Sequence, residues 1–177
     1  METFWARGYE STSVEDLCAA MAISRSSLYH AFGSKQALLC AALERYAAQA
    51  AARVAERLAR TRPVTRAVEA FLGDIAEEAV APHGRRGCLI GNCAVELAGN
   101  DAAAAARVQA CMRHVECVFE DALARGKAAG ELPPDADPRA LARFLTATVQ
   151  GLRLVAKADP DARALRDVVR CAVRCLR

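Results

Sequence analysis

The short segment from Ser24 to His30 contains the side chains whose types and spacing are best suited to hydrogen-bond a partner molecule. It reads Ser-Arg-Ser-Ser-Leu-Tyr-His, so polar groups surround a single aliphatic residue, Leu28. An arginine guanidinium can donate two hydrogen bonds to a guanine edge, and serine or histidine can reach bases or phosphates. With Leu28 facing inward, the remaining side chains form an exposed polar face suited to nucleic acid. That face comprises Arg25, Ser26, Ser27, Tyr29 and His30.

A first short helix is expected to support this face. Thr12-Ser13-Val14-Glu15 fits a capping box, in which a hydroxyl and a glutamate satisfy the first free amides of a helix. The helix then covers residues 14–21. Its buried side is expected to hold Val14, Leu17, Cys18 and Met21.

A tight turn separates this helix from a second one. Ala22-Ile23-Ser24 supplies the turn, and Ser24 is a good N-cap for a helix over residues 25–31. Leu28 and Phe32 are expected to face inward. Two short helices joined in this way predict a helix-turn-helix, whose second helix fits the major groove of DNA.

Composition favours an all-α protein. The 177 residues include 41 alanines, the best helix formers, but only 10 glycines and 6 prolines. No strand-like run of alternating β-branched and aromatic residues occurs, and no stretch is apolar for long enough to span a membrane. The breaks between apolar-periodic segments predict helices over residues 35–60, 64–81 and 88–98, one from Gly99-Asn100-Asp101 to near Gly130, and two opened by Asp137-Pro138 and Asp159-Pro160 with Asp as N-cap.

The spacing of residues from Phe4 to Leu39 closely resembles that of the TetR (tetracycline-repressor) family. The matching positions are Phe4, Gly8, Tyr9, Thr12, Ser13, Val14, Leu17, Ile23, Ser24, Leu28, Tyr29, Phe32, Lys35, Leu38 and Leu39. The resemblance implies a dimeric repressor with a helix-turn-helix DNA-binding domain over residues 1–46. It further implies a helical effector-binding and dimerisation domain over residues 47–177. In this family the repressor binds a double-stranded operator and is released from it by a small-molecule effector.

The resemblance also implies roles for individual residues. Ser13 would place a phosphate at the N-terminus of its helix, and Tyr29 and Lys35 would each bind a backbone phosphate. Arg25 and its neighbours Ser26 and His30 would face the base edges. Phosphate contacts set register and salt dependence, whereas base contacts set the choice of sequence.

Two features depart from the family pattern. The family's first helix extends further upstream than Met1, so we expect a shortened first helix. Residues 1–46 carry four Lys or Arg against five Asp or Glu, a net charge of −1, while the whole chain carries +3. DNA recognition then depends on where the few cations lie. Ala22 stands where the family usually has glycine, and we expect it to adopt a positive φ at a tolerable cost of about 1 kcal/mol.

The last two long helices are expected to pair with those of a second subunit, because the family dimerises through a four-helix bundle. The same periodicity also fits a core within one chain. The candidate interface residues are Leu141, Phe144, Leu145, Thr148, Leu152, Val155, Leu165, Val168, Val169, Val173 and Leu176.

The middle helices are expected to enclose an apolar effector pocket with a few polar anchors. Residues 87–98 are similar to the segment that opens the sixth helix in one branch of the family. The candidate pocket residues are Phe71, Ile75, Cys88, Leu89, Asn92, Cys93, Glu96, Met112, Val115, Phe119 and Gln150.

The eight cysteines are expected to be reduced thiols. Cys111, His114 and Cys117 offer soft ligands at helical spacing, but a four-coordinate site needs a further ligand, so we expect no metal. A thiol-sensing regulator is an alternative. In that reading, an electrophile or oxidant acts on Cys88, which follows two arginines, or on Cys93.

The sequence therefore predicts a TetR-like transcriptional regulator, located in the cytoplasm because no signal peptide begins the chain. No cofactor and no enzyme activity are expected, because the chain contains no Gly-x-Ser-x-Gly, no phosphate-binding glycine loop and no His-Glu-x-x-His. A second alternative is a helical dimer that binds a ligand or partner and has lost effective DNA binding.

Overall fold

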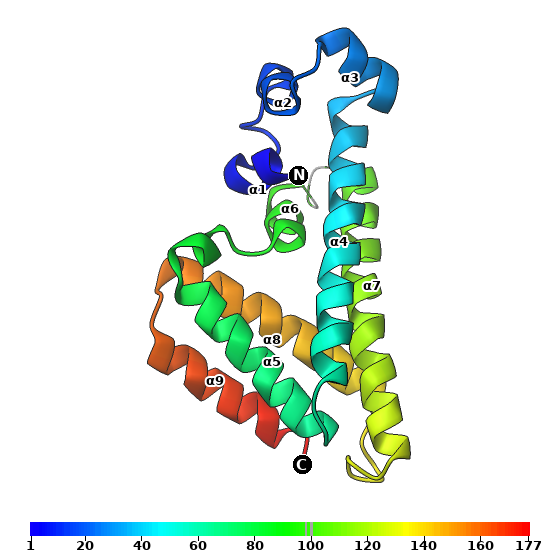
Figure 1. Cartoon of the computed structure of the whole chain (residues 1–177), viewed down its shortest axis with the longest axis vertical. Helices are drawn as coiled ribbons and strands as arrows, with labels where there is room; N and C mark the ends of the chain where they lie inside the picture. Colours follow the sequence, from blue (N-terminus) through cyan, green and yellow to red (C-terminus); the bar gives the residue numbers. More distant parts are fainter. Residues whose placement is uncertain (98, 100) are drawn as a thin grey trace. The chain divides into compact units, whose positions relative to one another are not determined.

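The computed structural model describes residues 1–97, 99 and 101–177, and this part of the chain forms helices without any strand (Figure 1). This confirms the all-α fold. The α-helices are α1 (Glu2–Arg7), α2 (Val14–Met21), α3 (Arg25–Phe32), α4 (Lys35–Ala59), α5 (Val64–Val80), α6 (Leu89–Leu97), α7 (Ala102–Ala128), α8 (Pro138–Ala158) and α9 (Ala162–Arg174), and a 3-10 helix, η1, covers Pro82–Arg86. The expected helix end at Ala98 and the expected start at Asn100 lie outside the described residues.

The start of α2 differs in detail from the prediction. Ser13 is the N-cap, and its capping-box partner is Asp16, not Glu15. The Ser13 side chain accepts a hydrogen bond from the Asp16 amide at 3.0 Å, and the Asp16 carboxylate accepts one from the Ser13 amide at 2.9 Å. Because the box joins the cap to the third helical residue, moving the cap from Thr12 to Ser13 moves the acidic partner by one position.

The turn after α2 has the conformation that the sequence predicts. Ala22 adopts the left-handed conformation, with φ 54° and ψ 41°. Leu17 is buried, but Val14 and Cys18 are half-buried and Met21 is 38% exposed. Only the centre of α2 therefore faces the core, because an eight-residue helix brings few positions onto one side.

Two aspartates were predicted to cap the last two helices, and only the first does so. Asp137 caps α8, accepting from the Arg139 amide at 2.9 Å. At α9 the cap is Asp161, which accepts from the Arg163 amide at 2.7 Å. Asp159 is instead the residue that ends α8. The prediction of an Asp159 cap was wrong because an Asp-Pro pair is as compatible with a connection between helices as with a helix start.

The described chain divides into two compact units. The first contains residues 1–48 and 88–112, and the second contains residues 49–87 and 113–177. The predicted DNA-binding segment 1–46 lies in the first unit, which also includes α6 and the beginning of α7.

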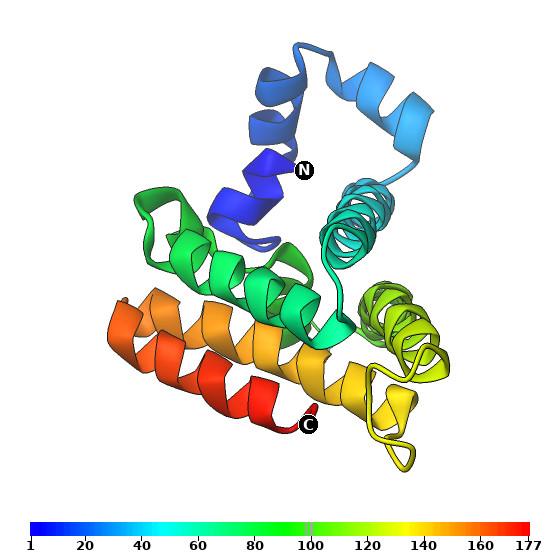
Figure 2. The ribbon, with the colours of Figure 1, turned by 60° about the horizontal axis from the view of Figure 1, so that its bottom comes forward.

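The second unit contains three helices packed side by side, with α5 in contact with both α8 and α9 (Figure 2). Their apolar faces form one core, which includes Leu72 of α5. Six of the candidate dimer residues also lie in this core: Leu145, Leu152, Leu165, Val169, Val173 and Leu176. They are therefore core residues of the chain itself, and the helical period alone did not distinguish this face from an exposed one.

The caps of α9 generate a prediction for stability. Asp161→Ala should lower the free energy of unfolding by about 1 kcal/mol, because two backbone amides lose their acceptor. Asp159→Ala removes the same charge two residues earlier and should change it by less than about 0.5 kcal/mol. Urea denaturation of both variants measures the difference. A larger loss for Asp159→Ala would contradict the assignment of the cap.

Candidate nucleic-acid interface

One face of α3 exposes the polar residues that the sequence singles out. Leu28 is completely buried, whereas Arg25, Ser26, Ser27, Tyr29 and His30 are exposed, and Phe32 is half-buried. Ser24 caps the helix by accepting from the Ser27 amide at 3.0 Å, and the two hydroxyls are 2.9 Å apart. The cap fixes the start of α3, so the polar face begins at its first turn.

Arg25 is held between two neighbouring side chains. Its Nη1 donates to Glu15 Oε1 of α2 at 2.7 Å, and both side chains are 63% exposed. A hydrogen bond with Tyr29, and then the Glu15 carboxylate, raise the pKa of the Arg25 guanidinium. These contacts limit the orientations of an otherwise flexible side chain at the surface. Sequence reasoning missed this role of Glu15 because it assigned Glu15 to the capping box.

The N-terminus of α2 carries a compact charged cluster. Arg7 of α1 donates to Asp16 Oδ1 at 2.8 Å, while Ser13 Oγ donates to Asp16 Oδ2 at 2.7 Å. Hydrogen bonds from Ser13, and then the neighbouring Arg7, lower the pKa of Asp16. A phosphate that approaches Ser13 therefore meets an Arg–Asp pair at the end of the helix.

Lys35, at the start of α4, lies against an aromatic ring. Its Nζ is 4.2 Å from the centroid of the Tyr9 ring, and Tyr9 in turn stacks on Phe4 with centroids 6.1 Å apart. Desolvation by burial, and then the Glu10 charge, raise the pKa of Tyr9. The contact holds the ammonium group beside the loop that follows α1.

The candidate pocket residues fall into both units. The first unit contains buried Cys88, Leu89 and Cys93 together with half-buried Asn92, Glu96 and Met112. The core of the second unit contains Phe71, Ile75, Val115 and Phe119, and Gln150 of that unit is half-buried. The rings of Phe71 and Phe119 meet edge to face at 5.5 Å. Within the second unit, the described residues of this set therefore serve as packing residues.

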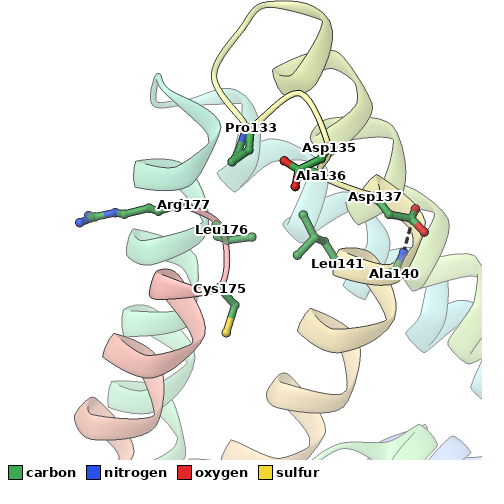
Figure 3. Close-up of a pocket in the computed structure, with 9 residues that line it drawn as sticks. All are labelled: Pro133, Asp135, Ala136, Asp137, Ala140, Leu141, Cys175, Leu176 and Arg177. Atoms are coloured by element: carbon green, nitrogen blue, oxygen red, sulfur yellow. Dashed lines mark hydrogen bonds between the residues drawn. The ribbon is translucent and has the colours of Figure 1, made fainter.

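A cavity of about 220 Å³ lies elsewhere in the second unit, between the connection that precedes α8 and the C-terminal end (Figure 3). Leu141 and Leu176 line it, while the side chain of Arg177 points away. None of the eleven candidate pocket residues, all of them described, lines this cavity.

The thiols show different environments. Cys111 is buried, whereas His114 and Cys117 are exposed, and the described residues contain no group of three His, Cys, Asp or Glu side chains able to hold a metal ion. Burial, and then the Glu96 charge, raise the pKa of Cys93 to about 12. At neutral pH Cys93 is therefore a protonated thiol, which disfavours it as the nucleophile of a thiol sensor.

Known protein families match both parts of the chain. Residues 1–42 match the bacterial regulatory proteins of the tetR family, and residues 63–172 match the tetracyclin repressor-like C-terminal domain. The chain belongs to the TetR family of transcriptional regulators. The resemblance that begins at Phe4 is thus confirmed, and the family is one of regulators, not of enzymes. In addition, no helix among the described residues has the length and apolarity to cross a membrane.

Individual TetR-family proteins resemble the chain over most of its length. YezE of Bacillus subtilis, an uncharacterized HTH-type transcriptional regulator, is 34% identical over 96% of this chain and 88% of its own. The HTH-type transcriptional repressor ComR of Escherichia coli is 28% identical over 98% and 83%. A cysteine mutant of the TetR-family regulator CifR, solved with a 26-bp double-stranded operator DNA, superposes with a TM-score of 0.86 at 30% identity, covering 99% of this chain and 91% of its own.

The burial of the thiols predicts selective alkylation. With iodoacetamide near neutral pH, exposed Cys117 should be modified while Cys93 stays unmodified, because burial raises the pKa of Cys93 and excludes the reagent. Peptide mass spectrometry measures both sites in the same sample, and denatured protein is the control in which both react. Equal rates at the two sites in native protein would contradict the described burial.

Proposed function

We propose that this TetR-family regulator is a cytoplasmic repressor that binds operator DNA through the exposed face of α3. The observation that carries the proposal is the division of α3 into buried Leu28 and an exposed polar face. Arg25, Ser26 and His30 read base edges, and Ser13, Tyr29 and Lys35 bind phosphates. Ser27 contributes through its place beside the Ser24 cap. The names of ComR, a repressor, and of CifR, solved with operator DNA, support this reading.

Two copies of the chain form the operator-binding dimer in this proposal. A helix-turn-helix protein of this kind reads two half-sites about one DNA turn apart, which needs two recognition helices. The remaining candidate interface residues suit this role, since Phe144, Val155 and Val168 expose apolar surface on α8 and α9, with half-buried Leu141 and Thr148 beside them. Leu154, which is 65% exposed, extends the apolar surface of α8.

A small-molecule effector controls DNA binding in this proposal. Such a ligand releases the operator only if it binds more tightly to the arrangement that does not fit DNA. On α6, Asn92 and Cys93 are the candidate contacts, since they lie one turn before Glu96 on the same side of the helix. The alternative, a ligand- or partner-binding dimer with impaired DNA binding, draws its support from the net charge of −1 over residues 1–46.

The role of Arg25 gives a direct test. Arg25→Ala should weaken binding to duplex DNA from the intergenic region beside the gene by roughly 10- to 100-fold, because a good arginine–base contact is worth about 1–3 kcal/mol. Fluorescence anisotropy over a salt titration measures this. Arg53→Ala removes an exposed cation of α4 and is the matched control, with an expected change below about twofold. Weak, sequence-blind binding by the unmodified protein would favour the alternative.

The dimer has its own test. Val168→Glu places a charge on the exposed apolar face of α9 and should convert the dimer to monomer at micromolar concentration, because an unpaired charge at an interface core is costly. Sedimentation velocity measures the state. Val95→Glu changes an 84% exposed valine of α6 and should leave the dimer intact. A monomeric unmodified protein would refute the dimer.

A further inference from the structure

One carboxylate of α6 binds the backbone of the loop between α1 and α2. The Tyr9 amide donates to Glu96 Oε2 at 2.9 Å, and the Glu10 amide donates to Glu96 Oε1 at 2.8 Å. The two oxygens thus bind two successive amides of a segment that lies more than 80 residues away in sequence. All three residues belong to the first compact unit.

The loop is shaped to receive this carboxylate. Gly8 has φ +83°, and a Cβ added to it would lie only 3.0 Å from Glu96 Oε2. Thr12, fully buried, donates its hydroxyl to the Gly8 carbonyl at 2.6 Å, which closes the loop on its other side. The positive φ favours glycine here, and a Cβ would also press against the Glu96 carboxylate.

The contact lies where it can fix the start of the helix-turn-helix. Glu10 is three residues before Ser13, the N-cap of α2, so fixing the Glu10 amide also fixes where α2 begins. Both oxygens of the Glu96 carboxylate accept from main-chain amides, one from Tyr9 and one from Glu10. Charge-assisted bonds of this kind are stronger than neutral ones and have strict geometry.

Neighbouring contacts in the same unit reach α4 instead. Gln36 Nε2 donates to Asp101 Oδ2, and Arg107 pairs with Glu44. These join the beginning of α7 to α4 and leave the loop after α1 untouched. Glu96, by contrast, connects α6 to the start of the helix-turn-helix, because its carboxylate accepts from the Tyr9 and Glu10 amides.

We propose that Glu96 is a positioning residue for operator binding, through which α6 holds the loop at Tyr9 and Glu10 and hence the start of α2. This inference rests on the proposed function and identifies the point at which α6 acts on the DNA-binding segment. In the structure the carboxylate oxygens of Glu96, which is also a predicted pocket residue, accept hydrogen bonds from these two backbone amides. A shift of α6 of about one ångström would lengthen both bonds together, because hydrogen bonds weaken steeply beyond their normal range.

The test combines amide exchange with DNA binding. Glu96→Gln keeps the volume but presents an NH₂ donor to one of the two amides, so that amide loses its acceptor. Hydrogen exchange of the amide that loses its acceptor, at Tyr9 or at Glu10, should accelerate by about tenfold as followed by NMR, and affinity for the intergenic duplex should fall by about tenfold. Glu96→Asp, which is too short to reach both amides, should act in the same direction and serves if the glutamine variant folds poorly.

Glu131 provides the matched control. Its carboxylate also accepts a backbone amide, that of Val64 at 2.7 Å, but in the second unit. Glu131→Gln should leave exchange at Tyr9 and Glu10 unchanged and operator affinity within about twofold of the unmodified protein. Global unfolding is monitored by exchange of the core amide of Leu72.

The outcomes separate this inference from the proposed function. Unchanged exchange at Tyr9 and Glu10 in Glu96→Gln would overturn the contact, and faster exchange with undiminished operator affinity would overturn the positioning role. If the unmodified protein itself fails to bind the duplex specifically, the proposed function fails, whereas the exchange result still reports on the contact.

Discussion

The shortness of α3 is the constraint on which the proposed DNA-binding face depends. An isolated helix of eight residues is not stable in water, since about 12–15 residues are needed even for favourable sequences. Its polar face therefore exists only because Ser24 caps its first turn and Leu28 is completely buried. The left-handed Ala22 ends α2 two residues before the Ser24 cap. Each of these residues helps to form or position the exposed polar face of α3, although none of them is part of that face.

Charge placement, not charge excess, characterises the DNA-binding segment. Of its four cations, Arg7 pairs with Asp16, Arg25 pairs with Glu15, and Lys35 lies over Tyr9. Exposed pairs contribute little to stability, but they orient long side chains that would otherwise sample many conformations. A cation that is already oriented loses less entropy when it meets DNA. A net charge of −1 implies that the segment is only weakly attracted to DNA in general. The smaller entropy cost compensates for part of that weakness.

Local rules explain which parts of the fold and of the site could be predicted from the sequence. Helix content, the Ala22 turn and the exposed face of α3 follow from propensity, capping and spacing within a few residues. The errors at Asp16 and Asp161 are shifts of one or two positions between adjacent acidic residues, where several side chains can cap the same helix end. The spacing of apolar residues in α8 could not show that Leu145 is buried and Phe144 exposed, because both faces of the helix carry apolar residues.

Long-range polar contacts were beyond such rules. Nothing near Glu96 in sequence indicates that its carboxylate binds amides at Tyr9 and Glu10, and a polar residue on an apolar helix reads equally well as a pocket anchor. At the other end of the contact lies Gly8, whose positive φ favours glycine and whose added Cβ would lie 3.0 Å from Glu96 Oε2. Without a side chain, this position lets another part of the chain come close. In this protein that part is α6, so the helix that carries candidate effector contacts also bonds directly to the loop from which the DNA-binding helices begin.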